Sequence, residues 1–143
     1  GINDSWDNAP VGVMTDSYNP DDFDRSTFAG ALEHLFYSAY RYFPNARLGY
    51  IINFQLPAAQ SDMSVYREIA LAICEKWKVA CYDMHADDAV TNALQPQNLT
   101  NMADVGHPNK SGYDILAPFI EEWFKTIPYA DISSFEKEMP SIS

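Results

Sequence analysis

The sequence contains few cysteines and offers little for metal or disulfide chemistry. Two of its 143 residues are cysteine, Cys74 and Cys81, and their spacing matches no zinc-binding motif. Two thiols also make no disulfide framework, so we interpret both as small buried side chains. Neither thiol lies beside a histidine or at the start of a helix, which argues against a catalytic cysteine.

Positive charge and long apolar runs are also scarce. Nine Lys and Arg residues stand against twenty Asp and Glu residues, and the net charge is −11. A surface this acidic repels nucleic-acid phosphates and anionic lipids, so we expect no nucleic-acid partner. No stretch is long and apolar enough to cross a bilayer, so we expect no membrane span.

Apolar and aromatic residues are abundant, at 47% and 14% of the chain. This composition is typical of a folded chain with a hydrophobic core, and the length suits one domain. We expect residues 1–128 to belong to that domain. Residues 129–143 are predicted to form a C-terminal tail that runs along the surface.

Apolar periodicity predicts three helices. Apolar side chains recur at three- and four-residue spacing in residues 24–42, 61–79 and 109–127. Asp24 is expected to cap the first helix and Pro44 to follow its end. Leu35, Val65 and Tyr113 belong to the stripes that we expect to face the core.

Two short apolar runs between these helices predict strands. Residues 47–54 and 79–84 lack polar alternation, which is typical of parallel strands buried on both faces. Pro57 is expected to end the first of them. Residues 1–24 and 85–106 are rich in turn-forming residues and are predicted to be long loops.

Strands that alternate with helices predict an α/β domain with a parallel sheet. A stable parallel sheet needs more than two strands, because both of its faces must be covered. We therefore expect further strands to lie upstream of Gly1, or a partner chain to supply them.

The segment from Asp104 to Asn109 (DVGHPN) contains the chain's most suggestive chemistry. An aspartate three residues before a histidine in a loop can hold the imidazole in one tautomer and stabilise its protonated form. Pro108 favours an extended backbone at His107, just before the last helix. The same residue types are also ordinary loop and cap residues. His34 and His85 lack such a neighbour, and we expect structural or solvent-facing roles for them.

The first residues, Gly1-Ile2-Asn3-Asp4, form a second motif. Taken alone, Asn-Asp is a common turn dipeptide. Together with Asp104, His107, Pro108 and Gly112, however, it resembles the Gly-x-Asn-Asp and Asp-x-x-His-Pro blocks of the SGNH (GDSL-type) serine hydrolases. The order of the blocks and the strands and helices between them also resemble that family, up to about Ile127.

The resemblance implies an ester hydrolase that works through an acyl-enzyme. Asn3 would donate its amide to the oxyanion, and Asp4 would brace the surrounding loop. His107 would act as general base and then general acid, with Asp104 orienting it. No metal or cofactor is needed for this chemistry. The substrate would be a small-molecule ester, including an acylated carbohydrate.

The resemblance also implies the C-terminal part of a flavodoxin-like three-layer α/β/α sandwich, with about five parallel strands in the whole domain. The family's nucleophilic serine and a second oxyanion glycine lie in its N-terminal part, and no matching block precedes Gly1. We reject Ser17 because it follows the Asn block instead of preceding it, has Thr15 in place of the glycine, and lies in a loop instead of after a strand. We reject Ser5 because nothing presents it to a base. The missing N-terminal part of the same domain is therefore an expected partner of these residues.

Two other interpretations remain open. The chain could be a non-catalytic α/β module that binds carbohydrate or another ligand, with Trp6, Tyr18 and Phe23 as stacking residues. It could also be an assembly domain that completes its sheet with a second chain. The module predicts that Asn3 and His107 lie far apart, whereas the hydrolase predicts that they meet at one cleft.

Overall fold

The computed structural model describes residues 2–56 and 63–141. Within these ranges the chain forms α1 (Ile2–Trp6), α2 (Phe28–Tyr42), β1 (Gly49–Ile52), α3 (Ser64–Lys76), β2 (Ala80–Asp83), α4 (Asp88–Leu94) and α5 (Lys110–Thr126). Short 3-10 turns occur at η1 (Pro20–Asp22), η2 (Pro96–Asn98) and η3 (Glu136–Glu138). The predicted strand end at Pro57 and helix start at Ser61 lie outside the described residues.

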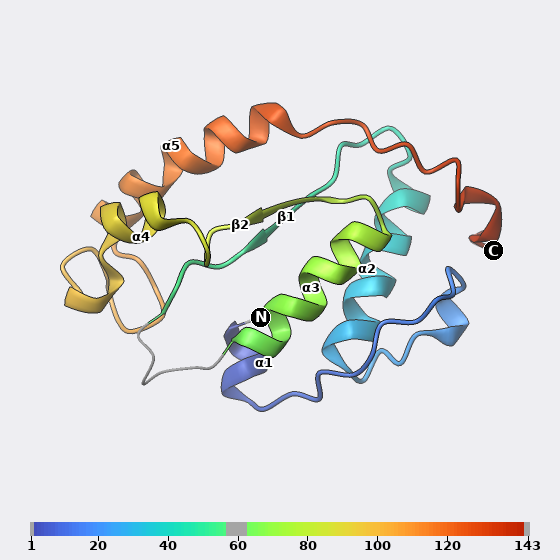
Figure 1. The fold of residues 1–143 in the computed structure, drawn as a ribbon, viewed down its shortest axis with the longest axis horizontal. Coiled ribbons are helices and arrows are strands. Elements are labelled where there is room, and N and C mark those ends of the chain that lie inside the picture. Colours follow the sequence, from blue (N-terminus) through green and yellow to red (C-terminus); the bar gives the residue numbers. More distant parts are fainter. Residues whose placement is uncertain (1, 57–62, 142–143) are drawn as a thin grey trace.

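A small parallel sheet lies at the centre of the fold. β1 pairs with β2 in parallel, from Gly49 opposite Ala80 to Ile52 opposite Asp83, and α3 connects the two strands. Helices α2 and α3 lie on one side of the strands, and α4 and α5 lie on the other (Figure 1). The α/β class with parallel strands is therefore confirmed.

β1 is less buried than its sequence predicts. Ile52 is buried, but Tyr50 and Ile51 are half-buried and Gly49 is exposed. A parallel strand becomes buried when other strands flank both of its edges and helices cover both faces. Among the described residues, β2 is the sole strand paired with β1, so one edge of β1 has no strand beside it.

Two apolar clusters hold the layers together. The larger cluster joins α2 and α3 to the sheet, and its fully or almost fully buried members include Ala29, Phe36, Ile73, Cys74 and Trp77. The smaller cluster joins α4 and α5 to the other face, and includes Phe54, Met84, Val90, Leu94 and Leu116. Burial of each such large apolar side chain contributes about 1.5–3 kcal/mol to folding.

The first long helix begins later than predicted. Thr27, not Asp24, is the N-cap of α2, and its Oγ1 accepts a hydrogen bond of 3.2 Å from the backbone N–H of Gly30. Asp24 instead accepts hydrogen bonds from the backbone and hydroxyl of Ser26, one turn earlier. Thr27 and Asp24 are both good capping types, so local sequence did not distinguish them.

The predicted apolar stripes have the correct helical period, but some residues at their edges face solvent and not the core. Leu35, Val65 and Tyr113 are exposed by 56%, 48% and 58%. On α3 the buried positions are Tyr66, Ala70, Ile73 and Cys74, so the buried side of the helix lies beside Val65 and not on it. Periodicity gives the spacing of a helical stripe, but the packing of neighbouring elements decides which margin is covered.

Both predicted long loops contain a helix that we missed. α1 occupies the start of residues 1–24, and α4 lies within residues 85–106. Asp87 caps α4, because its Oδ1 accepts hydrogen bonds from the backbone N–H groups of Ala89 and Val90. The aspartate cap, followed by apolar residues at positions 90 and 94, was the available signal.

The C-terminal tail runs over the surface with most of its described residues exposed, but two apolar side chains anchor it to the core. Phe135 and Met139 are 2% and 4% exposed and belong to the larger cluster. The Tyr37 hydroxyl donates a 2.9 Å hydrogen bond to the carbonyl of Pro140, and Lys78 donates one of 2.8 Å to the carbonyl of Asp131. These contacts fix the tail against α2 and the end of α3.

A buried ion pair anchors the segment between α1 and α2. Glu33 on α2 is 0% exposed and pairs with Lys76 on α3. Glu33 also accepts hydrogen bonds from the backbone of Thr15 and the indole of Trp77. Lys76 donates to the carbonyls of Thr15 and Ser17, at 2.8 and 2.7 Å. Both charges are thus paired and hydrogen-bonded, as burial requires.

The sequence predicted two small buried cysteine side chains and no membrane span. Cys74 is buried and Cys81 is half-buried, and both are free thiols. Among the described helices, none has the length and apolar character needed to cross a bilayer.

Replacing Lys76 with methionine should destabilise the protein strongly. Glu33 would then be a buried charge without its cation, and breaking such a pair lowers the free energy of unfolding by about 3–5 kcal/mol. Urea denaturation measures this loss. Lys125→Met is the matched control, because Lys125 forms solvent-exposed pairs with Glu121 and Glu122 that contribute little to stability. Equal effects of the two substitutions would contradict the prediction.

Candidate active site

Asp104 and His107 are in direct contact in the loop before α5. His107 Nδ1 lies 2.9 Å from Asp104 Oδ1 and 3.0 Å from Oδ2. The same Oδ1 accepts hydrogen bonds of 2.8 Å from the backbone N–H groups of Gly106 and His107. The carboxylate therefore organises its own loop as well as the imidazole.

Backbone contacts hold this loop in place. Met102 and Pro108 form an antiparallel bridge, and the N–H of Ala103 donates a 2.7 Å hydrogen bond to the carbonyl of His107. Asn109 is the N-cap of α5, and its side chain accepts from the N–H of Gly112 at 3.0 Å. His107 is thus fixed immediately before the helix. With Nδ1 directed to the carboxylate, Nε2 is the ring nitrogen left for proton exchange.

Asp104 titrates below its ordinary range. The hydrogen bond from the N–H of Gly106, followed by that from the His107 side chain, lowers the pKa of Asp104 below 3.8. Asp104 therefore stays ionised at neutral pH and can stabilise a protonated His107. The two side chains are 57% and 61% exposed, so solvent screens this pair.

Trp6 links α1 to the loop. Its ring packs edge-on to the His107 ring, with centroids 6.4 Å apart. A Cβ added at Gly106 would lie 2.4 Å from Trp6 Cη2, a distance that real Cβ atoms essentially never show. Position 106 therefore has room only for glycine while the Trp6 ring lies against it. Tyr66 on α3 donates its hydroxyl toward the carbonyls of Asp4 and Ala9, at 3.2 and 2.6 Å. α1 is therefore held from two sides.

These contacts bring Asn3 and Asp4 of the first motif and the loop of His107 to one cavity of about 460 Å³, whereas Gly1 lies outside the described residues. Asn3 and Asp4 line it from α1, and His107 lines it from the loop before α5. The rest of the lining follows β1 and β2 or belongs to the loop and α5: Asn53, Phe54, Met84, Gly106, Pro108, Tyr113, Leu116 and Ile120. The cavity thus lies at the carboxyl ends of the parallel strands, where open α/β sheets bind ligands.

The structure therefore brings together Asn3, Asp4 and His107, with Asp104 behind the imidazole. Sequence reasoning missed Asn53 and Met84. Each follows a strand by one residue, so the two predicted strand ends were the signal that could have found them.

The rejected serines and the other histidines lie elsewhere. Ser5 and Ser17 are not among the residues that line this cavity, and the Ser17 hydroxyl donates to Asp22 at 2.6 Å. His34 lies on α2 at a separate surface hollow and stacks near Tyr37, and His85 follows β2 outside the cavity lining. No group of three or more potential metal-binding side chains occurs within residues 2–56 and 63–141.

Comparison with known proteins identifies the fold but no family. No protein-family model matches the chain, and neither does any curated protein. A crystal structure of a Lactobacillus plantarum protein, from a structural genomics consortium, matches with a TM-score of 0.71 at 19% identity, over 87% of this chain and 63% of its own. A second crystal structure matches with a TM-score of 0.71 at 20% identity, over 89% and 62%.

These likenesses show the fold alone, because their sequence identity is so low. They also show that the chain spans less than two thirds of the length of either structure.

Replacing Gly106 with alanine should displace Trp6. The new Cβ would overlap the indole, and relieving such a clash in a packed site costs about 1–3 kcal/mol. The indole N–H resonance of Trp6 in a ¹⁵N–¹H NMR spectrum should shift. The resonance of Trp77, which is fully buried in the other cluster, is the internal control and should not move. An unshifted Trp6 resonance would show that the contact does not hold α1.

The carboxyl group of Asp104 should titrate below pH 3.8, as measured by ¹³C NMR. Its folded-state pKa is lowered, so the stability that its contacts contribute is present above the unfolded-state pKa and is lost as the pH falls through the folded-state pKa. His107→Ala should move the midpoint part of the way back up, because the Gly106 hydrogen bond remains. A wild-type midpoint at or above 3.8 would contradict the observed geometry.

Proposed function

We propose that the chain is the C-terminal part of an SGNH (GDSL-type) serine hydrolase and contributes to ester hydrolysis. One observation carries the proposal: Asn3 and His107, from opposite ends of the sequence, line one cavity, and Asp104 holds the imidazole there. A ligand-binding module that contained the two motifs by chance would have no reason to bring them together. The convergence therefore favours a hydrolase.

Each residue has a defined role in the proposed reaction. His107 Nε2 accepts the proton of a serine hydroxyl while the oxygen attacks the ester carbonyl, and it then returns the proton to the leaving alcohol. Asn3 donates its amide to the oxyanion of the tetrahedral intermediate, a contribution of roughly 3–4 kcal/mol. Asp104 stabilises the transient imidazolium. A water molecule then attacks the acyl-enzyme by the same two proton transfers through His107, and the carboxylic acid is released.

The nucleophilic serine is proposed to lie outside these 143 residues. In the flavodoxin-like three-layer sandwich of the proposed family, it belongs to the N-terminal part of the domain. Two features support this placement: the second edge of β1 has no strand beside it among the described residues, and the matched structures are longer than this chain. The exposure of Asp104 and His107 is consistent with a site that further residues cover.

The test requires the full-length polypeptide and an activated ester such as p-nitrophenyl acetate. His107→Ala should lower kcat by roughly 10³-fold or more, because the serine loses its base. Asn3→Ala should lower kcat by roughly 10²–10³-fold with little change in KM, since the oxyanion develops during the reaction and is not present in the bound ester. His34→Ala is the control and should leave turnover unchanged. Unchanged turnover in the His107 variant would refute the proposal.

A further inference from the structure

Tyr66 on α3 is hydrogen-bonded to the backbone of α1 and of the turn that follows it. Its hydroxyl lies 2.6 Å from the carbonyl of Ala9 and 3.2 Å from that of Asp4. The last carbonyls of a helix have no partner inside the helix, so the Tyr66 hydroxyl satisfies part of this end of α1. Tyr66 is not among the residues that line the cavity of Asn3 and His107. Its connection to the site therefore runs through the backbone of α1.

α1 is too short to hold its own position. It has five residues, and isolated helices shorter than about 12–15 residues are marginal in water. Its place beside the cavity is therefore set by tertiary contacts, which are the ring of Trp6 on one side and the hydroxyl of Tyr66 on the other. Asn3 precedes Asp4 in the same helical turn, so a shift of the Asp4 backbone also moves Asn3.

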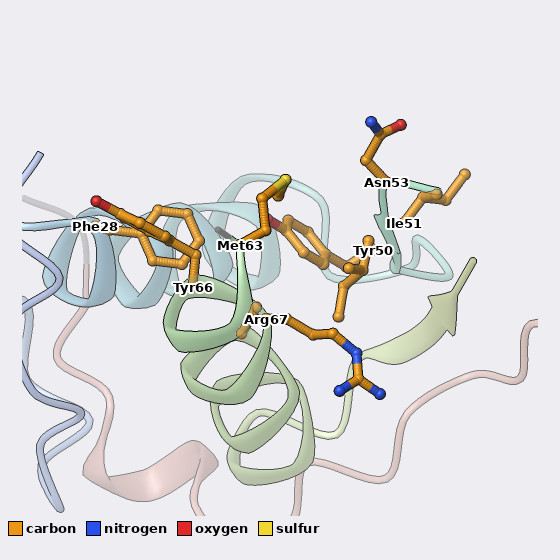
Figure 2. A pocket seen from close by; sticks show the side chains of 9 residues that line it. Phe28, Tyr50, Ile51, Asn53, Met63, Tyr66 and Arg67 are labelled. Atoms are coloured by element: carbon orange, nitrogen blue, oxygen red, sulfur yellow. The ribbon is translucent and has the colours of Figure 1, made fainter. Parts of the chain in front are cut away.

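The Tyr66 side chain is itself held firmly. It is 6% exposed, and its ring packs edge-on to Phe28 with the centroids 5.3 Å apart. Figure 2 shows the Tyr66 ring beside Phe28, with the hydroxyl directed away from Arg67. Arg67 is engaged by Asp83, with Nε 2.9 Å from Oδ2, and does not compete for the carbonyls of α1. A packed ring has little rotamer freedom, so its hydroxyl can fix the position of another element.

We propose that Tyr66 is a positioning residue, whose hydroxyl holds α1 so that the Asn3 amide meets the developing oxyanion, a role that rests on the proposed ester hydrolysis. A catalytic group must be held within about 0.5 Å of its productive position. A misplacement of about 1 Å can cost roughly 10²-fold in rate. The bound ester carries no oxyanion, so the loss of this hydroxyl should lower kcat and leave KM nearly unchanged.

The experiment removes one buried hydroxyl at each of two matched positions in the full-length protein. Tyr37→Phe is the control for Tyr66→Phe, because Tyr37 is 5% exposed and donates to the distant carbonyl of Pro140 at 2.9 Å. With p-nitrophenyl acetate, Tyr66→Phe should lower kcat by roughly 10-fold or more and change KM by less than about 3-fold. Tyr37→Phe should leave both constants within about 2-fold of the wild type.

A double-mutant cycle then tests whether Tyr66 acts through Asn3. In the Asn3→Ala protein the amide is already gone, so adding Tyr66→Phe should lower kcat by less than about 3-fold. All variants are assayed well below their melting temperatures, so that loss of folded protein does not enter kcat. Equal kcat values for the two tyrosine variants, or the full Tyr66→Phe loss in the Asn3→Ala protein, would overturn the inference and leave the hydrolase intact. A wild type that hydrolyses no ester, or full turnover in His107→Ala, would remove both.

Discussion

The parallel pairing of β1 with β2 is the constraint on which the candidate site depends. Parallel strands bring their carboxyl ends to one edge, so the residues after Ile52 and Asp83 become neighbours. The hydrogen bond from the N–H of Met84 to the carbonyl of Ile52, at 3.2 Å, extends this pairing to the floor of the cavity. Asn53 and Met84 line the cavity for this reason, and α5 closes it from one side.

The buried pair of Glu33 and Lys76 serves the site from a distance. It ties the segment around Thr15 to α2 and α3, which sets the path by which the N-terminal residues return to the sheet. The hydroxyl of Tyr66 and the ring of Trp6 then place α1 at the edge of the cavity. Asn3 and His107 line one cavity because of this chain of contacts.

The stability of the site and its proposed chemistry place opposite demands on the same residues. The core clusters satisfy their polar members with partners, as Glu33 and Lys76 show. At the cavity, by contrast, the His107 side chain is exposed to solvent. His107 stays open to a substrate, whereas Glu33 and Lys76 are committed to each other in the core, and functional sites commonly give up stability in this way.

The sequence by itself determined the α/β class, the parallel strands, the extent of α5, and the Asp104–His107 contact, because each depends on local spacing. Only the tertiary structure decided which margins of the helices are buried, that Phe135 and Met139 return to the core, and that Asn53 lines the cavity. The reason is physical: periodicity and capping act within a few residues, whereas burial depends on partners brought together by the whole fold.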